Sequence, residues 1–503
     1  MSASQVKNRT DGLPSSFQEQ EKPVYNWVDF QVKDPDDPFE WSPLKKWIQF
    51  SFACVFTIGT AIAAASYVSG LEQVNRDFGV TKQAVRVLPI AVYPLGCALP
   101  PLFLAPFSEF IGRKPIYVSG ILIWVSMFVG IGFSKNIASV IIFRLIQGGA
   151  ASIGASMVGG TAADLWRTSE RGIPMALFAV AGAGGAGAGP LWAGWVAQTI
   201  GWRWIQHIQA AFFGAFFILF FLFVSESRGS VILARRAARL RKETGDESYR
   251  ARAEEERESL SAMIKTSLTR PMWLLVTEPI VFFFSLWLAF AWGMLYNLLE
   301  SIGLVTALHD YSPGQTGLVF LTLLIGTILG FCTTFIQEAL YRRNVLRKGP
   351  EARLYAACAG GVLFSVGCFI YGWTSFRTVS IAGPIVGLLV LTLGIYHIYL
   401  AVFNYLADSY LIYASSALAA QSFLRNMFGF AFPLFATQMY TKLTYPWAST
   451  LIGLLGAILG IIPFALYRWG PQIRAKSQFS HQLQLQEAER IKALQAQLGE
   501  ETA

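Results

Sequence analysis

The sequence predicts an all-α polytopic membrane protein whose twelve transmembrane helices form two six-helix bundles in a parallel repeat. The first observation is composition: 54% of the 503 residues are hydrophobic and only 14% are charged, whereas soluble domains carry roughly 25% charged residues. The second is a series of apolar runs, each close to the roughly 20 residues that a helix needs to cross a bilayer. The third is that charged residues and prolines recur at matched places in the two halves, which favours parallel repeats around a central path.

The apolar runs divide six and six around a hydrophilic insertion that is rich in Arg and Glu. They lie near residues 47–69, 86–107, 116–134, 137–160, 173–199, 206–224, 274–298, 316–337, 354–373, 380–405, 415–440 and 447–468. The expected order is a polar, disordered tail (1–45), a first bundle (46–224), a solvated and partly helical linker (225–273), a second bundle (274–469) and a second tail (470–503).

The distribution of basic residues predicts the orientation. Of the 40 Lys and Arg residues, 31 fall in the tails, the linker and the loops on the same side, and seven fall in the opposite loops. Because basic residues accumulate on the cytoplasmic side, both termini are expected there, and a plasma-membrane location is expected. The first 40 residues hold no apolar core, so the first span is expected to direct insertion. The net charge of +9 needs no nucleic-acid partner to explain it.

The repeat is visible in two charge patterns. Glu109 precedes Arg113 and Lys114 in the first half, and Glu338 precedes Arg342–Arg343 at the same offsets in the second half. These groups are expected in short loops, where their ion pairs can break and reform as the helices tilt. The alternative, that Arg113 and Lys114 serve only to orient the chain, stays open.

A second pattern places an acidic residue at a fixed distance before a helix-bending proline. Asp164 precedes Pro190 by 26 residues, and Asp408 precedes Pro433 by 25 residues. Proline removes a helix donor and bends the helix. Charge and bend therefore recur together in the two halves.

The loop at 105–115, APFSEFIGRKP, resembles the signature loop of major facilitator superfamily transporters. Ala105 stands at the usual leading glycine and Glu109 at the usual acidic position. Phe110 stands where many members have a basic residue, so one of the family's gating contacts is expected to be weaker. The resemblance implies the major facilitator fold.

Arg144 lies inside an apolar run, where a charge costs at least about 2.5 kcal/mol and needs a partner. The stretch RLIQGGA is similar to the superfamily's motif R-x-x-Q-G, with Gln147 at the matching place, and the resemblance implies a role of Arg144 in proton coupling. A structural arginine paired with backbone carbonyls is the alternative. Arg425 poses the same question in the other half.

A glycine-rich stretch at 182–194, GAGGAGAGPLWAG, lies inside an uncharged run. Small residues at helical spacing let a second helix approach closely, and Gly182, Gly185 and Gly189 are expected to share one face. The stretch also resembles a motif that is characteristic of the superfamily's exporting antiporters, with Ala193 replacing one glycine. The matching residues are Gly185, Gly189, Pro190 and Gly194.

Longer stretches narrow the resemblance to the fungal 12-span drug:proton antiporter family. They include DPDDPFEWSPLKKW before the first span and NYLADSYLIYASSALAAQSFLRNMFGFAFPLF at 404–435. The resemblance covers about residues 34 to 472. It implies export of xenobiotics, polyamines, organic acids or secondary metabolites in exchange for protons.

Polar and aromatic side chains inside spans are the candidates for a substrate path, because burying polar groups in a membrane is costly. Such groups suit a semi-polar or amphipathic organic molecule, and core packing stays open for each. The candidates are Tyr93, Gln147, Trp292, Tyr296, Asn297, His397, Gln421, Arg425 and Asn426. Glu300 lies near the outer end of its span, and the first half has no carboxylate in mid-span, so proton coupling rests on the resemblance.

The predicted function is secondary active export of a small organic molecule by proton antiport with alternating access. A proton-coupled nutrient importer of the same fold and a non-transporting receptor are the alternatives. An enzyme is not expected, because no metal-ligand cluster, nucleophile–base pair or phosphate loop lies between the spans. No cofactor or metal is expected, and the partners are the substrate, protons and the bilayer around a monomer. Five cysteines in or beside apolar runs are expected to be packing residues: Cys54, Cys97, Cys332, Cys358 and Cys368.

Overall fold

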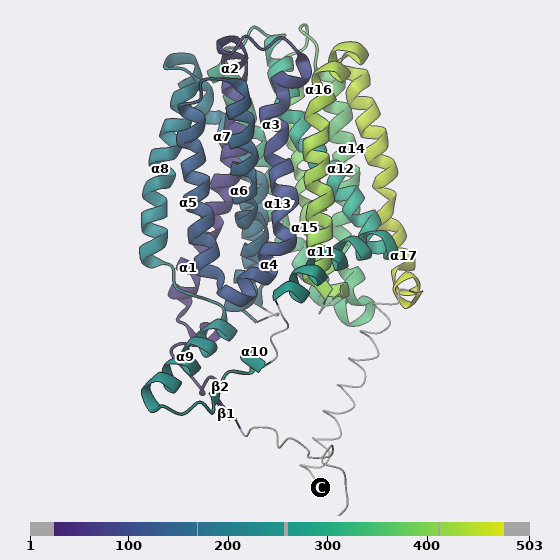
Figure 1. Cartoon of the computed structure of the whole chain (residues 1–503). Helices are drawn as coiled ribbons and strands as arrows, with labels where there is room; N and C mark the ends of the chain where they lie inside the picture. The colour runs from purple at the N-terminus through teal and green to yellow at the C-terminus, as the bar shows by residue number, and fades with distance from the viewer. Residues whose placement is uncertain (1–24, 168–169, 256–259, 411–412, 477–503) are drawn as a thin grey trace, which may run out of the picture.

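The computed structural model describes residues 25–167, 170–255, 260–410 and 413–476, and its long helices stand side by side in one bundle (Figure 1). Within these ranges, eleven helical segments are long and apolar enough to cross a membrane. The last of them breaks at Thr444, whose φ of 65° and ψ of 160° are not helical, so it supplies two crossings. The predicted all-α membrane fold is confirmed.

The spanning helices follow the chain in two sets of six. The first set contains α1 (Pro43–Ser66), α3 (Gln83–Ala98) continued by α4 (Pro100–Ile111), α5 (Arg113–Gly132), α6 (Ile137–Leu165), α7 (Gly172–Thr199) and α8 (Trp202–Phe223). The second set contains α12 (Pro279–Ala307), α13 (Pro313–Lys348), α14 (Tyr355–Thr374), α15 (Ala382–Tyr410), α16 (Ala414–Leu459) and α17 (Ile461–Lys476), with the break inside α16. A short 3₁₀ turn (Tyr67–Gly70) and α2 (Leu71–Asp77) follow α1.

The segment between the two sets forms α9 (Gly229–Thr244), β2 (Tyr249–Arg250), α10 (Arg252–Glu255) and α11 (Leu260–Thr277). We call the end of the bundle beside α9 and α11 the linker end, and the opposite end, beside α2, the far end (Figure 1). Helix α1 begins at the linker end, at Pro43, and the last helix, α17, also lies there, beside the linker (Figure 1).

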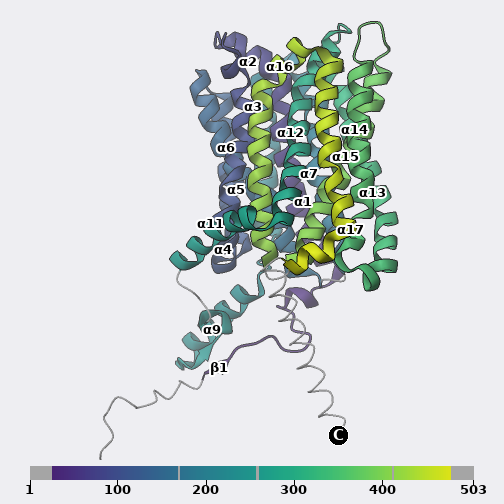
Figure 2. The same ribbon diagram turned by 90° about the vertical axis from the view of Figure 1, so that its right-hand side faces the viewer.

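The seventh span begins later than the sequence predicted. Its helix starts at Pro279 rather than near residue 274, because proline is favoured in the first turn of a helix, where its missing N–H is not needed. The apolar residues before it belong to α11, on which Trp273 and Val276 are exposed. Figures 1 and 2 show α11 lying across the linker end of the bundle rather than along it.

The end of the N-terminal tail is structured, which corrects the expectation of disorder up to residue 45 over its described part. Asn26–Trp27 (β1) pairs in parallel with β2 of the linker, and Arg236 lies 2.6 Å from Asp34. The acidic tail and the Arg-rich linker attract each other, which sequence composition alone did not reveal. The hydrogen bond from Arg236 holds the pKa of the Asp34 carboxyl well below its usual range. The contribution of this hydrogen bond to stability is therefore complete at neutral pH. It is lost as the pH falls below the usual pKa range of an aspartate.

The glycine-rich helix α7 lies between α1 of its own half and α13 of the other half. A Cβ added at Gly189 would lie 2.7 Å from the carbonyl oxygen of Ile62 in α1. A Cβ added at Gly187 would lie 2.6 Å from the backbone nitrogen of Leu324 in α13. Glycine thus allows close packing on two faces of α7, whereas the sequence analysis expected one. The second face joins the two halves.

Replacing Gly187 with alanine is expected to lower the free energy of unfolding by about 1–3 kcal/mol, the usual effect of overpacking. The added Cβ would meet the backbone of α13, which cannot move as a side chain can. Gly303→Ala in α12 is the matched control, because a Cβ added there meets nothing within 4 Å. Inside a helix, alanine is more favourable than glycine by about 1 kcal/mol. Thermal melting of the two purified variants in detergent measures the difference, and equal melting temperatures would contradict the prediction.

Candidate functional site

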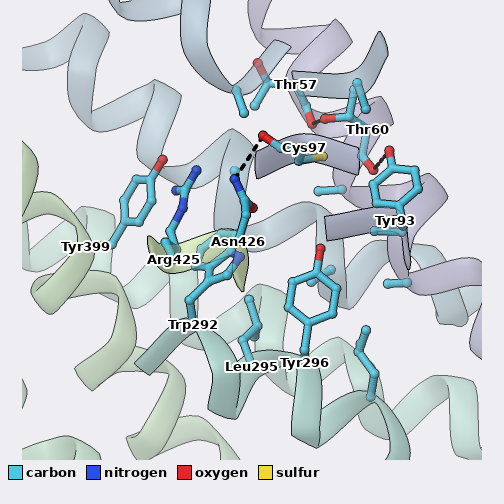
Figure 3. Close-up of a pocket in the computed structure, with 18 of the residues that line it drawn as sticks. Thr57, Thr60, Tyr93, Cys97, Trp292, Leu295, Tyr296, Tyr399, Arg425 and Asn426 are labelled. Atoms are coloured by element: carbon cyan, nitrogen blue, oxygen red, sulfur yellow. Dashed lines mark hydrogen bonds between the residues drawn. The ribbon is translucent and has the colours of Figure 1, made fainter. Parts of the chain in front are cut away.

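A central cavity lies between the two halves, and helices of both halves line it (Figure 3). Its volume is about 70 Å³. Helices α1, α3, α6 and α7 contribute from the first half, and α12, α15 and α16 contribute from the second. Five of the predicted substrate-path residues line the cavity: Tyr93, Trp292, Tyr296, Arg425 and Asn426.

The other predicted substrate-path residues do not line it. Asn297 donates to the hydroxyl oxygen of Tyr440 at 3.2 Å, because one residue after Tyr296 a helix side chain points about 100° away. Gln147 accepts a hydrogen bond from Arg144. His397 lies 2.8 Å from Thr333 and lines a separate, smaller cavity. Gln421 is buried and does not line the central cavity.

Sequence reasoning missed several lining residues, and Cys97 is the clearest case. Cys97 lines the cavity rather than serving only as packing. Its carbonyl oxygen accepts a hydrogen bond from Asn426 of the other half at 3.2 Å. The residue four positions on is Pro101, which has no N–H, so the helix leaves this carbonyl free. The proline pair after α3 was the sequence signal for such a free acceptor.

An aromatic wall forms the Arg425 side of the cavity. Trp292 and Tyr399 stack with their ring centres 5.5 Å apart, and Tyr399 is 4.7 Å from Phe403. The guanidinium carbon of Arg425 lies 4.6 Å from the Trp292 ring centre. Tyr399 was missed because a tyrosine inside an apolar run carries no charge to mark it.

Arg425 is 2% exposed, yet its polar contacts are weak. Nη2 donates to Ser422 Oγ at 3.4 Å, and Nε is buried without a hydrogen-bond partner. No carboxylate forms an ion pair with it in the part of the chain that the structure describes. Buried charges are ordinarily paired and hydrogen-bonded, so Arg425 is an exception that calls for a ligand or a function.

Arg144, by contrast, has four acceptors. It donates to the carbonyl oxygens of Pro89 (2.9 Å), Ala63 (3.0 Å) and Ala64 (3.4 Å), and to Gln147 Oε1 at 3.0 Å. Ala63 and Ala64 lie in the last turn of α1, where carbonyls lack helical partners. This arrangement matches the alternative of a structural arginine. Its guanidinium also packs against the Tyr93 ring, which lines the cavity.

Contacts between the halves lie on both sides of the cavity. Towards the linker end, the rings of Phe178 and Phe403 are 6.2 Å apart. Towards the far end, Gly194 packs directly against Pro313, and the backbone nitrogen of Gly314 donates to Gln198 at 3.2 Å. The two halves are therefore in contact on both sides of the cavity.

A charge cluster ties the predicted signature loop to the linker. Arg113 Nε lies 2.9 Å from Asp164, and Arg228 lies 3.0 Å from the same carboxylate. Glu109 is farther from its partner, with Oε1 3.7 Å from Nη2 of Arg228. Glu226 accepts from the backbone N–H groups of Arg113 at 2.8 Å and the next residue at 3.2 Å, where a helix N-terminus favours an anion. The side chain of Lys114 approaches the Phe221 ring instead.

Glu226 and Arg228 were not predicted, although the segment SESR directly follows the sixth span. The second half repeats the cluster with a different arginine. Arg353 lies 3.0 Å from both Asp408 and Glu338. The sequence had pointed to Arg342–Arg343, but α13 continues as a helix through them and the Arg342 side chain is 75% exposed.

The comparisons with known proteins agree with this architecture. A family model described as Major Facilitator Superfamily matches residues 51–433. The chain belongs to the major facilitator superfamily. Among its relatives in this superfamily is the MFS-type transporter paaT of Penicillium rubens, 34% identical, with 91% of this chain and 84% of paaT covered. The efflux pump FUBT of Fusarium oxysporum is 34% identical, with 89% and 77% covered.

A third relative in the superfamily, the multidrug transporter mdrA of Aspergillus fumigatus, is 32% identical over 90% of this chain and 76% of its own. Among solved structures, the chain is similar to the xylose transporter XylE of E. coli in a partially occluded inward-open conformation. The TM-score is 0.60 at 16% identity, with 84% of this chain and 99% of XylE covered. This likeness concerns the fold. Family and relatives indicate a transporter of small molecules rather than an enzyme.

Proposed function

We propose that the protein is a secondary active transporter that exports a small organic molecule across the plasma membrane in exchange for protons. The observation that carries the proposal is the central cavity, which both halves build, with contacts between the halves on both sides of it. Rocking of one half against the other would open such a cavity to one side at a time. This is alternating access by a monomer.

The small size of the cavity fits a state in which the two halves lie close together. A volume of about 70 Å³ is below the roughly 300–1,000 Å³ of ligand pockets. A drug-sized molecule therefore enters only when the halves move apart. The charge clusters around Asp164 and Asp408 lie at the linker end, where their ion pairs would hold neighbouring helices of each half together as the halves rock.

Export rather than import is supported by two observations. Relatives at 32–34% identity carry the names efflux pump and multidrug transporter. The glycine-rich face of α7, which packs against both α1 and α13, coincides with the stretch that resembles the antiporter motif. We infer that the linker end, which holds the basic linker, faces the cytoplasm.

Transport in inside-out plasma-membrane vesicles tests the proposal. With an acidic lumen, outward proton flow should drive accumulation of an added probe, and a protonophore should abolish it. Salicylate serves as an anionic probe and rhodamine 6G as a cationic probe, with vesicles from cells lacking the protein as the control. The expected result is protein-dependent accumulation of at least one probe.

The same vesicles separate the alternatives. Accumulation only in right-side-out vesicles with an acidic exterior would indicate a proton-coupled importer. Absence of protein-dependent movement in both orientations, repeated with a wider set of organic acids and dyes, would indicate a non-transporting receptor. Either result contradicts the proposal.

A further inference from the structure

We propose that the central cavity selects organic anions, with Arg425 binding the carboxylate or another acidic group of the substrate. The inference rests on the proposed function and adds the substrate class to it. An amphipathic acid would place its charged end on Arg425 and its apolar body against Trp292 and the aliphatic lining (Figure 3).

The contrast between the two buried arginines is the first argument. Arg144 has four acceptors and does not line the cavity, so its donors are occupied by the protein itself. Arg425 is equally buried and does line the cavity, but its Nε has no partner. A guanidinium held at the cavity wall with unused donors is suited to an acceptor that arrives from outside the protein.

The geometry leaves N–H donors of the Arg425 guanidinium free for a ligand. The Trp292 ring lies against it at 4.6 Å, as in a cation–π contact. Of the guanidinium donors, Nη2 makes only a long hydrogen bond to Ser422 Oγ at 3.4 Å, and Nε has no hydrogen-bond partner. A carboxylate can take two of these donors at once. Figure 3 shows Arg425 reaching into the cavity between Tyr399 and Asn426.

The charge of the lining is the second argument. Neither Asp nor Glu occurs among the residues that line the cavity in the described ranges, and Arg425 is the charged group there. A polyamine or another organic cation would meet an unpaired positive charge without a compensating carboxylate, which is unfavourable in a site of low polarity. Of the substrate classes that the sequence left open, organic anions fit this lining best.

Cys97 lines the same cavity and provides a test; its thiol donates to the carbonyl oxygen of Gly148 at 3.0 Å, a contact that it leaves when it reacts. In a variant that keeps Cys97 and replaces the other four cysteines with serine, we would compare two thiol reagents of similar size. One is the negatively charged sulfonatoethyl methanethiosulfonate, and the other is the positively charged trimethylammonium analogue. The ratio of their reaction rates reports the local charge and cancels any change in the reactivity of the thiol.

We expect the ratio of anionic to cationic rate to fall by about tenfold or more when Arg425 is replaced with glutamine. Arg425→Lys keeps the charge and should keep most of the ratio. An unchanged ratio in Arg425→Gln would overturn the anion proposal and leave the transport pathway intact. Absence of reaction with both reagents in the chain that keeps Arg425 would instead contradict the proposed function, because the cavity would then never open to water.

A second measurement uses Arg425 in place and is independent of how well its variants fold. With a neutral thiol reagent, 1-naphthoate should protect Cys97 at concentrations about tenfold or more below those of 1-naphthamide, which has the same shape without the charge. Equal protection, or protection by the amide alone, would overturn the proposal. In Arg425→Gln the difference between acid and amide should vanish.

Discussion

Replacing Arg144 with alanine is expected to reduce transport by about a hundredfold. The substitution removes three hydrogen bonds that join α6 to α1 and α3, and a fourth to Gln147 within α6. It leaves the buried carbonyls of Ala63 and Ala64, in the last turn of α1, without this partner, and an unsatisfied buried group costs about 1–3 kcal/mol. Two such losses sum to about 2–6 kcal/mol, a range that includes the roughly 2.8 kcal/mol of a factor of 100. The measurement is proton-driven probe accumulation in vesicles, normalised to the protein present in the membrane.

Two further variants show what Arg144 contributes. Arg144→Lys keeps a charge but offers its donors from one nitrogen, so it cannot reach Pro89 and Ala63 as the guanidinium fork does. It should lose about tenfold or more. Arg86→Ala removes a half-exposed ion pair with Glu72 and should have little effect, as surface pairs are worth about 0–1 kcal/mol. Unchanged pH-dependent transport in Arg144→Ala would contradict both the structural role and the proposed coupling role of this residue.

The fold was predictable because its signals are local. An apolar run long enough to span a bilayer identifies a helix without knowledge of its neighbours. The start of the seventh span needed a second signal, because proline in the first turn of α12 places it at Pro279. The close packing of α7 was also visible, because glycine density has few other uses inside a membrane. That Gly187 faces the other half required the neighbouring helix, which the sequence does not provide.

The site was less predictable, because it depends on which side of each helix faces the centre. Tyr296 lines the cavity and Asn297 does not, although both were equally good candidates from the sequence. The same limit applies to the charge clusters. Arg353, rather than Arg342–Arg343, makes the close ion pairs with Glu338 and Asp408, because α13 extends beyond the predicted loop. The spacing of charged residues along the sequence revealed the repeat, but it did not show which residues form the ion pairs.

Glu300 is a buried carboxylate that differs from the paired acids of the two clusters. Its side chain is near the far end of α12, and the residue is 8% exposed. Thr437 donates to Oε2 at 2.7 Å, while Oε1 is buried without a partner. None of the ion pairs within the described ranges involves it. A buried carboxyl with one unpaired oxygen and no basic partner is suited to take up and release a proton in the proposed antiport cycle.

Replacing Glu300 with glutamine is therefore expected to abolish accumulation driven by a pH gradient, because glutamine keeps the shape and cannot exchange a proton. Exchange of labelled for unlabelled probe across the same vesicles needs no net proton movement, and it should persist and become independent of pH. Asp310→Asn is the matched control, since Asp310 is an exposed acid beyond the end of α12 that pairs with the exposed Arg377. It should leave both activities unchanged. Accumulation at the unsubstituted level in Glu300→Gln would show that another group carries the proton, whereas loss of exchange as well would show that Glu300 supports the path itself rather than the coupling.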